Sequence, residues 1–243
     1  MEGRRTVRVP ESLKLTAKRR MKLTLVLPPG SKKCPVVVFS HGNPVPPHFY
    51  DYLARAWQKV GIATLFVHHL PDGGNVRRAS AWPIRARDIT RVIGLLGKVH
   101  GRLDRSRIAV AGHSHGAHAA AALAGAVLFL PKGRKLSLRD RRVCAAVLIS
   151  SPRNGVMGLR ASSRKRIVVP CLEMAGARES RRARSRSEIL VAGATHESFI
   201  DATLVDDQMK IISRPDRKAQ RLTRKLTTDF LVGVFQTPTP KKH

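Results

Sequence analysis

Apolar positions along the chain fall into two kinds of segment. Residues 35–40 (PVVVFS) form a continuous β-branched run, which is typical of a strand buried on both faces of a parallel sheet. In residues 49–60 the apolar positions recur at helical spacing, and Gly61 follows as a C-cap. The same patterns predict further strands over residues 21–27, 62–67, 107–111, 143–149, 167–174 and 188–191, and helices over residues 83–99, 115–128 and 217–235.

Strands that alternate with helices at this spacing predict an α/β fold with a mainly parallel central sheet flanked by helices. A chain of 243 residues suits one domain of ordinary size. No linker, repeat or break in composition divides it. We therefore expect a basic N-terminal segment over residues 1–20, a single α/β domain over residues 21–236, and a flexible tail over residues 237–243.

The composition excludes several classes of protein. A hydrophobic fraction of 42% is too high for a disordered basic tail. No run approaches the ~20 apolar residues that a membrane-spanning helix needs. The basic N-terminus lacks the apolar core of a signal peptide, so we expect a cytoplasmic protein. Its three widely spaced cysteines (Cys34, Cys144 and Cys171) are predicted to be buried thiols and not a disulfide framework.

The charge is the least ordinary property of the chain. Lys and Arg number 46 against 16 Asp and Glu, so the net charge is +30. Such a surface attracts polyanions non-specifically. The basic residues are spread along the whole chain, however, and aromatic residues that could stack on bases make up only 5%. We interpret the charge first as a general surface property, with a polyanion-binding or nucleic-acid-binding protein on an inactive enzyme scaffold as an alternative.

The strongest chemical signal is the G-x-S-x-G motif at residues 112–116 (GHSHG), between a predicted strand and a predicted helix. A nucleophile on so tight a turn needs small neighbours, which explains Gly112 and Gly116. The turn raises the Ser114 hydroxyl above the sheet and directs the first amides of the next helix, including that of His115, at the reacting carbonyl. A simple glycine-rich turn is the alternative interpretation.

Two other places complete this pattern. Residues 40–43 (SHGN) follow the strand 35–40, where a serine hydrolase has the other half of its oxyanion hole. The amides of Asn43 and His115 would then hold the oxyanion. His196 is the only histidine in the second half of the chain apart from its last residue, so it is the candidate base if the triad runs in the order Ser, acid, His.

The stretches at residues 40–69, 85–125, 169–180 and 194–201 resemble the α/β-hydrolase superfamily, and within it most closely the dienelactone hydrolase-like and platelet-activating-factor acetylhydrolase-like branch. The resemblance implies an α/β-hydrolase fold without a large cap domain, and a serine esterase that acts on a small-molecule ester with no metal or organic cofactor. It also implies that Ser114 attacks the ester carbonyl, that His196 transfers the proton, and that an acidic residue orients His196.

The acid is the weakest part of the match. The family has an aspartate in the loop after the strand that resembles residues 167–174, and in this chain Glu179 stands there. Arginines crowd Glu179, so a structural ion pair is an alternative role for it. Glu173 and Asp201 are the other candidates. We expect Glu179 to be the acid.

A zinc-dependent hydrolase is a rival hypothesis. His113, His115 and His118 spell H-x-H-x-x-H, which resembles the zinc motif of metallo-β-lactamase-like hydrolases. That family has an aspartate where this chain has Ala117, and a helix beginning at His115 would separate the imidazoles. We therefore predict no metal site here.

The segments expected around the site mouth are polar. Between the strands 143–149 and 167–174 the chain is rich in basic and small residues and cannot form an apolar lid helix, and residues 70–82 are equally polar. This predicts a preference for short acyl esters, from acetate to about hexanoate.

Overall fold

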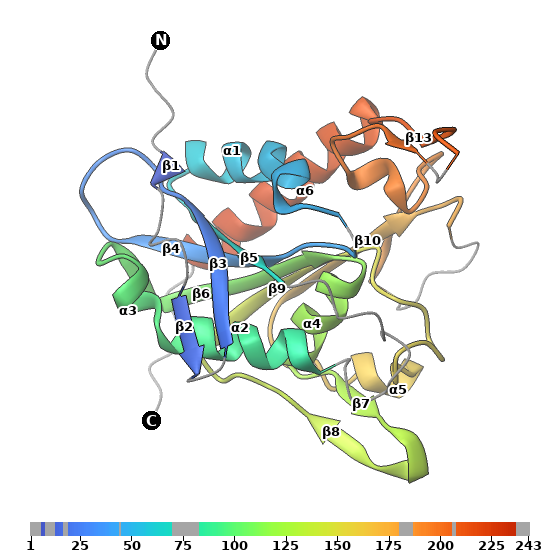
Figure 1. Cartoon of the computed structure of the whole chain (residues 1–243), viewed down its shortest axis with the longest axis horizontal. Coiled ribbons are helices and arrows are strands. Elements are labelled where there is room, and N and C mark those ends of the chain that lie inside the picture. The colour runs from blue at the N-terminus through green and yellow to red at the C-terminus, as the bar shows by residue number, and fades with distance from the viewer. Residues whose placement is uncertain are drawn as a thin grey trace.

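Within the described residues, the computed structural model has a central β-sheet of nine strands (Figure 1). The structure describes residues 6–7, 13–16, 19–43, 45–69, 83–179, 187–205 and 208–236. The predicted tail, residues 237–243, and the polar segment 70–82 lie outside the described residues.

The order of the strands is β1-β3-β5-β4-β6-β9-β10-β11, and β2 pairs with β3. These strands are β1 (Thr6–Val7), β2 (Leu13–Thr16), β3 (Arg19–Val26), β4 (Cys34–Ser40), β5 (Ala63–His68), β6 (Leu103–His113), β9 (Val143–Ile149), β10 (Cys171–Gly176) and β11 (Ile189–Val191). All pairings from β5 to β11 are parallel, whereas β1, β2 and β5 each lie antiparallel to β3. The predicted mainly parallel sheet is confirmed.

Helices cover both faces of this sheet (Figure 1). The helices are α1 (Asp51–Lys59), α2 (Ile84–Gly94), α3 (Leu96–Val99), α4 (His115–Ala124), α5 (Ala161–Arg164) and α6 (Arg217–Gln236). Helices α1 and α6 pack together on one face, and α2, α3 and α4 lie on the other. Among the described residues, no helix combines the length and the apolar character that crossing a membrane requires.

Strand β4 shows why the sheet needs cover on both sides. All seven of its residues are buried. Val36 and Val38 pack into the cluster that contains α2 and α4, while Val37 and Phe39 pack into the cluster that contains α1 and α6. Successive strand residues point to opposite faces, so a continuous apolar run is what a strand between two helical layers requires.

Several predicted boundaries were wrong. The helix expected over residues 83–99 breaks at Leu95, between two glycines of low helix propensity, into α2 and α3. The helix expected over residues 115–128 ends at Ala124, because Gly125 takes φ 123°. The strand expected from residue 167 begins only at Cys171, directly after Pro170, which has no N–H to donate to a ladder.

The pattern also missed short elements that depend on their partners. Strands β1 and β2, from the first 20 residues, pair with β3. Two small hairpins add β7 (Val127–Phe129) with β8 (Lys135–Ser137), and β12 (Leu204–Val205) with β13 (Ile211–Ser213). All three cysteines are free, but only Cys34 is buried; Cys144 and Cys171 are half-buried, contrary to the expectation of buried thiols throughout.

Candidate active site

Ser114 lies in a strained turn between β6 and α4. Its backbone has φ 55° and ψ −119°, a conformation that costs a non-glycine residue about 1–3 kcal/mol. Neighbouring elements hold the turn: the Ser114 N–H donates to the Ile149 carbonyl of β9 at 2.9 Å, and the Ser114 carbonyl accepts from the His118 N–H at 3.1 Å. Ser114 is partly exposed, at the carboxyl end of a central parallel strand. In open α/β sheets this edge is where ligands bind.

The two glycines of the motif are required by close backbone contacts. A Cβ atom at Gly116 would lie 1.8 Å from the Ser40 carbonyl oxygen, and one at Gly112 would lie 2.3 Å from the Gly116 carbonyl carbon. Such contacts are far inside van der Waals distance, so only glycine lets the turn approach the end of β4 this closely. These contacts are the reason that the motif has glycine at both positions.

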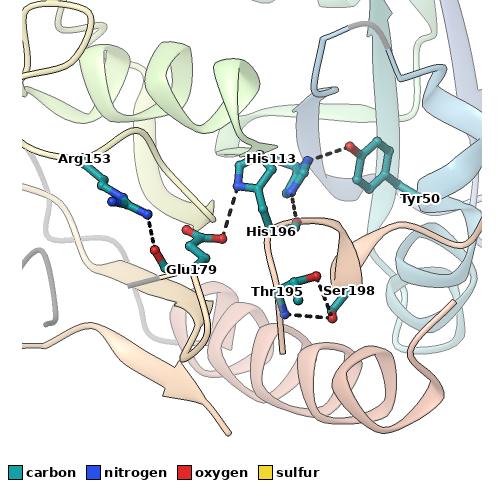
Figure 2. A network of polar contacts seen from close by, with 7 residues as sticks. All are labelled: Tyr50, His113, Arg153, Glu179, Thr195, His196 and Ser198. Carbon is teal, nitrogen blue, oxygen red and sulfur yellow. Dashed lines mark hydrogen bonds and ion pairs between the residues drawn. The ribbon is translucent and has the colours of Figure 1, made fainter. Parts of the chain in front are cut away.

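His196 and Glu179 lie next to each other on two other strand ends (Figure 2). Glu179 follows β10, and His196 follows β11 and precedes the short 3-10 helix η3 (Glu197–Phe199). His196 Nδ1 is 3.1 Å from Glu179 Oε2, with the Glu179 side chain 7% exposed and that of His196 38% exposed. The Ser198 hydroxyl accepts from the Thr195 N–H at 2.9 Å and so closes the turn that carries His196.

The other two candidate carboxylates have different partners. Glu173, within β10, forms a buried ion pair with Arg164 at 2.8 Å. Asp201 pairs with Arg217 at 2.7 Å. The hydrogen bond from Arg153 to Glu179 goes to the backbone carbonyl oxygen of Glu179 and not to its carboxylate. Of the three candidates, Glu179 is the one for which the structure describes a hydrogen bond to His196.

The segment after β4 lies against the serine turn. A Cβ atom at Gly42 would be 3.6 Å from Ser114 Cβ. Asn43 follows at once and is partly exposed, and His115 is the first residue of α4. The residues proposed for the oxyanion hole therefore flank the serine from two elements.

The structure does not bring the three imidazoles of the H-x-H-x-x-H motif together. His113 Nδ1 is 2.9 Å from the Tyr50 hydroxyl and its Nε2 is 2.9 Å from the His196 carbonyl oxygen, so both ring nitrogens are engaged. His118 Nε2 is 2.9 Å from the Met157 carbonyl oxygen. Among the described residues no group of three or more His, Cys, Asp or Glu side chains could hold a metal ion.

Sequence reasoning missed the residues behind the site. Tyr50, at the end of the 3-10 helix η1 (Pro47–Tyr50), contacts both Gly42 and His113. Arg85, on the buried side of α2, donates to the His41 carbonyl at 2.6 Å. A charged residue on the buried face of a predicted helix is a signal that could have identified Arg85. Nothing in the sequence distinguishes Tyr50.

A family model described as the alpha/beta hydrolase family matches residues 37–239. The chain belongs to this family. No curated protein matches it.

Solved structures with the same fold include esterase 2 of the planctomycete Thermogutta terrifontis in several states. The butyrate-bound form has a TM-score of 0.64 and 17% identity over 97% of each chain. The propionate-bound form has a TM-score of 0.63 and 18% identity over 95% of this chain and 97% of that one. The form phosphorylated by paraoxon has a TM-score of 0.64 and 16% identity, again over 95% and 97%. At these identities the likeness establishes the fold.

Proposed function

We propose that this protein is a serine esterase that cleaves carboxylic esters through an acyl-enzyme intermediate. The observation that carries the proposal is a serine in a strained strand-to-helix turn at the same sheet edge as a hydrogen-bonded His196–Glu179 pair. A nucleophile, a base and an orienting acid on separate strand ends form the arrangement that acyl transfer needs. The fold shared with an esterase adds support.

In this mechanism the Ser114 hydroxyl attacks the ester carbonyl carbon while His196 Nε2 takes the hydroxyl proton. Glu179 accepts from His196 Nδ1–H, which holds the ring in the correct tautomer and stabilises the imidazolium that forms. The amides of Asn43 and His115 stabilise the oxyanion. His196 then gives the proton to the leaving alkoxide, and a water molecule hydrolyses the acyl-Ser114 ester by the same steps.

Labelling with a fluorophosphonate tests the nucleophile, because only an activated serine reacts readily with it. Ser114→Ala should abolish labelling and lower kcat by about 10⁴-fold or more, with the unfolding transition preserved. Ser150 is a control serine, because it too has a positive φ, of 46°, and directly follows a central strand, β9, but it is fully buried. Ser150→Ala should be labelled like the wild type; equal labelling of Ser114→Ala would end the serine mechanism.

We also propose that the substrates carry short acyl chains and that the enzyme belongs to the dienelactone hydrolase-like and platelet-activating-factor acetylhydrolase-like branch. Between β9 and β10 all residues are described, and the only helix there is the four-residue α5, too short for an apolar lid. The esterase of the same fold binds butyrate and propionate. Both observations support a small acyl pocket.

A second proposal concerns the charge: a groove between α1 and α6 binds the phosphate backbone of duplex nucleic acid without sequence preference. The groove has a volume of about 790 Å³, and six basic side chains line it: Arg55, Lys59, Arg217, Arg221, Arg224 and Lys225. Its two carboxylates are already paired, Asp201 with Arg217 and Asp229 with Lys225. Among the described residues that line the groove, Tyr52 is the one aromatic residue, and it is buried. We therefore expect binding to depend on backbone charge and not on base stacking.

The salt dependence of binding to a short DNA duplex tests this location. A plot of the logarithm of the binding constant against the logarithm of the salt concentration has a negative slope, to which each phosphate contact contributes about 0.9. Replacing both Arg221 and Arg224 with Gln should make this slope shallower by about 2. Arg139→Gln with Arg141→Gln removes the same charge from another exposed site. An equal effect of both pairs would mean that the charge acts as a whole and that the groove is not a binding site.

A further inference from the structure

Tyr50 is a fully buried residue whose hydroxyl lies between two parts of the site. The hydroxyl oxygen is 3.3 Å from the Gly42 nitrogen. It is also 2.9 Å from His113 Nδ1 (Figure 2). A backbone N–H can only donate, so Gly42 donates to the Tyr50 oxygen. Burial raises the pKa of Tyr50, which keeps its proton in place. The His196 carbonyl oxygen beside His113 Nε2 can only accept, so a neutral His113 carries its proton on Nε2 and the Tyr50 O–H donates to Nδ1.

The protonation state of His113 agrees with this direction. Burial, together with the charge of the nearby His196, lowers the pKa of His113 to about 3, so the ring is neutral at working pH. A neutral imidazole carries one proton, and with Nδ1 accepting it must be on Nε2. Nε2–H then donates to the His196 carbonyl oxygen at 2.9 Å. The rings of His113 and His196 are also in contact, with centroids 4.8 Å apart.

The hydrogen bonds thus form a directed series from the Gly42 N–H through Tyr50 and His113 to the backbone of His196. Gly42, at the start of this series, has a second contact: its carbonyl oxygen is 2.6 Å from His41 Nδ1. The peptide unit is planar, so holding the Gly42 carbonyl also sets the direction of the Asn43 N–H across the same peptide bond. The series ends at His196, whose imidazole ring is oriented by Glu179.

We propose that Tyr50 is a positioning residue, and that its hydroxyl, acting through His113, holds the oxyanion loop and the catalytic histidine in fixed places around Ser114. This inference rests on the proposed esterase function. A displacement of about 1 Å between reacting groups can cost about 100-fold in rate, so one shared hydroxyl can affect both proton transfer and oxyanion stabilisation.

Tyr50→Phe removes only the oxygen, and Tyr52→Phe is its matched control. The Tyr52 hydroxyl is also buried, and it donates to the Phe199 carbonyl at 3.0 Å, outside the series. Tyr50→Phe loses its bonds to Gly42 and His113, and Tyr52→Phe loses its bond to Phe199, so urea unfolding should show a loss of stability in both variants, with the larger loss in Tyr50→Phe. For hydrolysis of p-nitrophenyl butyrate, Tyr50→Phe should lower kcat about 10- to 100-fold with KM within two-fold. Tyr52→Phe should keep kcat within two-fold.

His113→Asn provides a second variant, because its amide can reach the Nδ1 position but has no group at Nε2, so the bond to His196 alone is lost. It should also lower kcat with little change in KM. The positioning role would be overturned if Tyr50→Phe and His113→Asn both kept the wild-type kcat. It would also be overturned if Tyr52→Phe lost as much kcat as Tyr50→Phe. In either case the proposed esterase function would stand. A folded wild type that neither hydrolyses esters nor reacts with a fluorophosphonate would overturn both.

Discussion

Acidification from pH 8 to pH 5 should destabilise the fold by titrating two buried histidines. His113 ends β6 and His118 lies in α4, and each is 1% exposed. Burial is the main cause that lowers the pKa of His113 to about 3 and that of His118 to about 4. The charges of His196 near His113, and of His115 near both rings, act in the same direction. Hydrogen bonds to backbone carbonyls only partly oppose the shift.

The sign and size of the effect follow from linkage. A histidine in the unfolded chain has a pKa of about 6.5, so below this pH the unfolded state binds more protons than the folded state. The stabilisation is fully present above pH 6.5 and is lost as the pH falls toward the folded pKa values. At pH 5 each histidine accounts for a loss of about 2 kcal/mol, or about 4 kcal/mol together. That is a large share of the about 5–15 kcal/mol of an ordinary domain.

Urea unfolding followed by tryptophan fluorescence, at constant ionic strength and at pH 8, 7, 6 and 5, measures the loss. His118→Gln is the matched variant, because its amide N–H can still donate to the Met157 carbonyl but cannot titrate. It should show about half of the pH-dependent loss. General repulsion within so basic a chain would act on both proteins alike. Equal pH dependence in the two proteins, or a wild type equally stable at pH 5 and pH 8, would show that the buried histidines do not cause the loss.

Three further predictions concern the site. Glu179→Gln should lower kcat about 100-fold or more by weakening its support of His196, and Asp201→Asn should leave kcat near the wild-type value; steady-state kinetics would show a wrong assignment if the two effects were reversed. Gly116→Ala should yield little folded protein, judged by circular dichroism and urea unfolding, because its Cβ would lie 1.8 Å from the Ser40 carbonyl oxygen. A p-nitrophenyl ester series should peak between acetate and about hexanoate, and a maximum at decanoate or longer would reveal an apolar groove.

The fold could be predicted because its signals are local. The β-branched run of β4 and the small residues of α4 each indicate burial without knowledge of their partners. The elements that the sequence missed are short, such as β1 with two residues, and they exist because β3 offers an edge to pair with. Pairing with a distant strand leaves no repeating hydrophobic pattern in the sequence, so such short strands cannot be predicted from it.

The same distinction applies to the site. The turn at Ser114 could be predicted because it needs glycines at fixed offsets, and His196 became the candidate base because chain order left little choice; the catalytic roles of both stay predictions. Glu179 required the resemblance to a family, since a loop with several arginines offers no spacing rule. Tyr50 could not be predicted, because its role depends on Gly42 and His113 meeting at its hydroxyl from two different strands.

The high charge and the proposed chemistry act over different ranges. Acyl transfer creates an oxyanion and an imidazolium together, so a uniform positive field would favour the first and oppose the second. The surface field is screened over about 8–10 Å in physiological salt, whereas Glu179 meets His196 at 3.1 Å with its side chain only 7% exposed. Glu173, which is close in sequence, is neutralised by Arg164. Local pairing therefore governs the orientation of His196 by Glu179, and the net charge of +30 governs which molecules approach the surface.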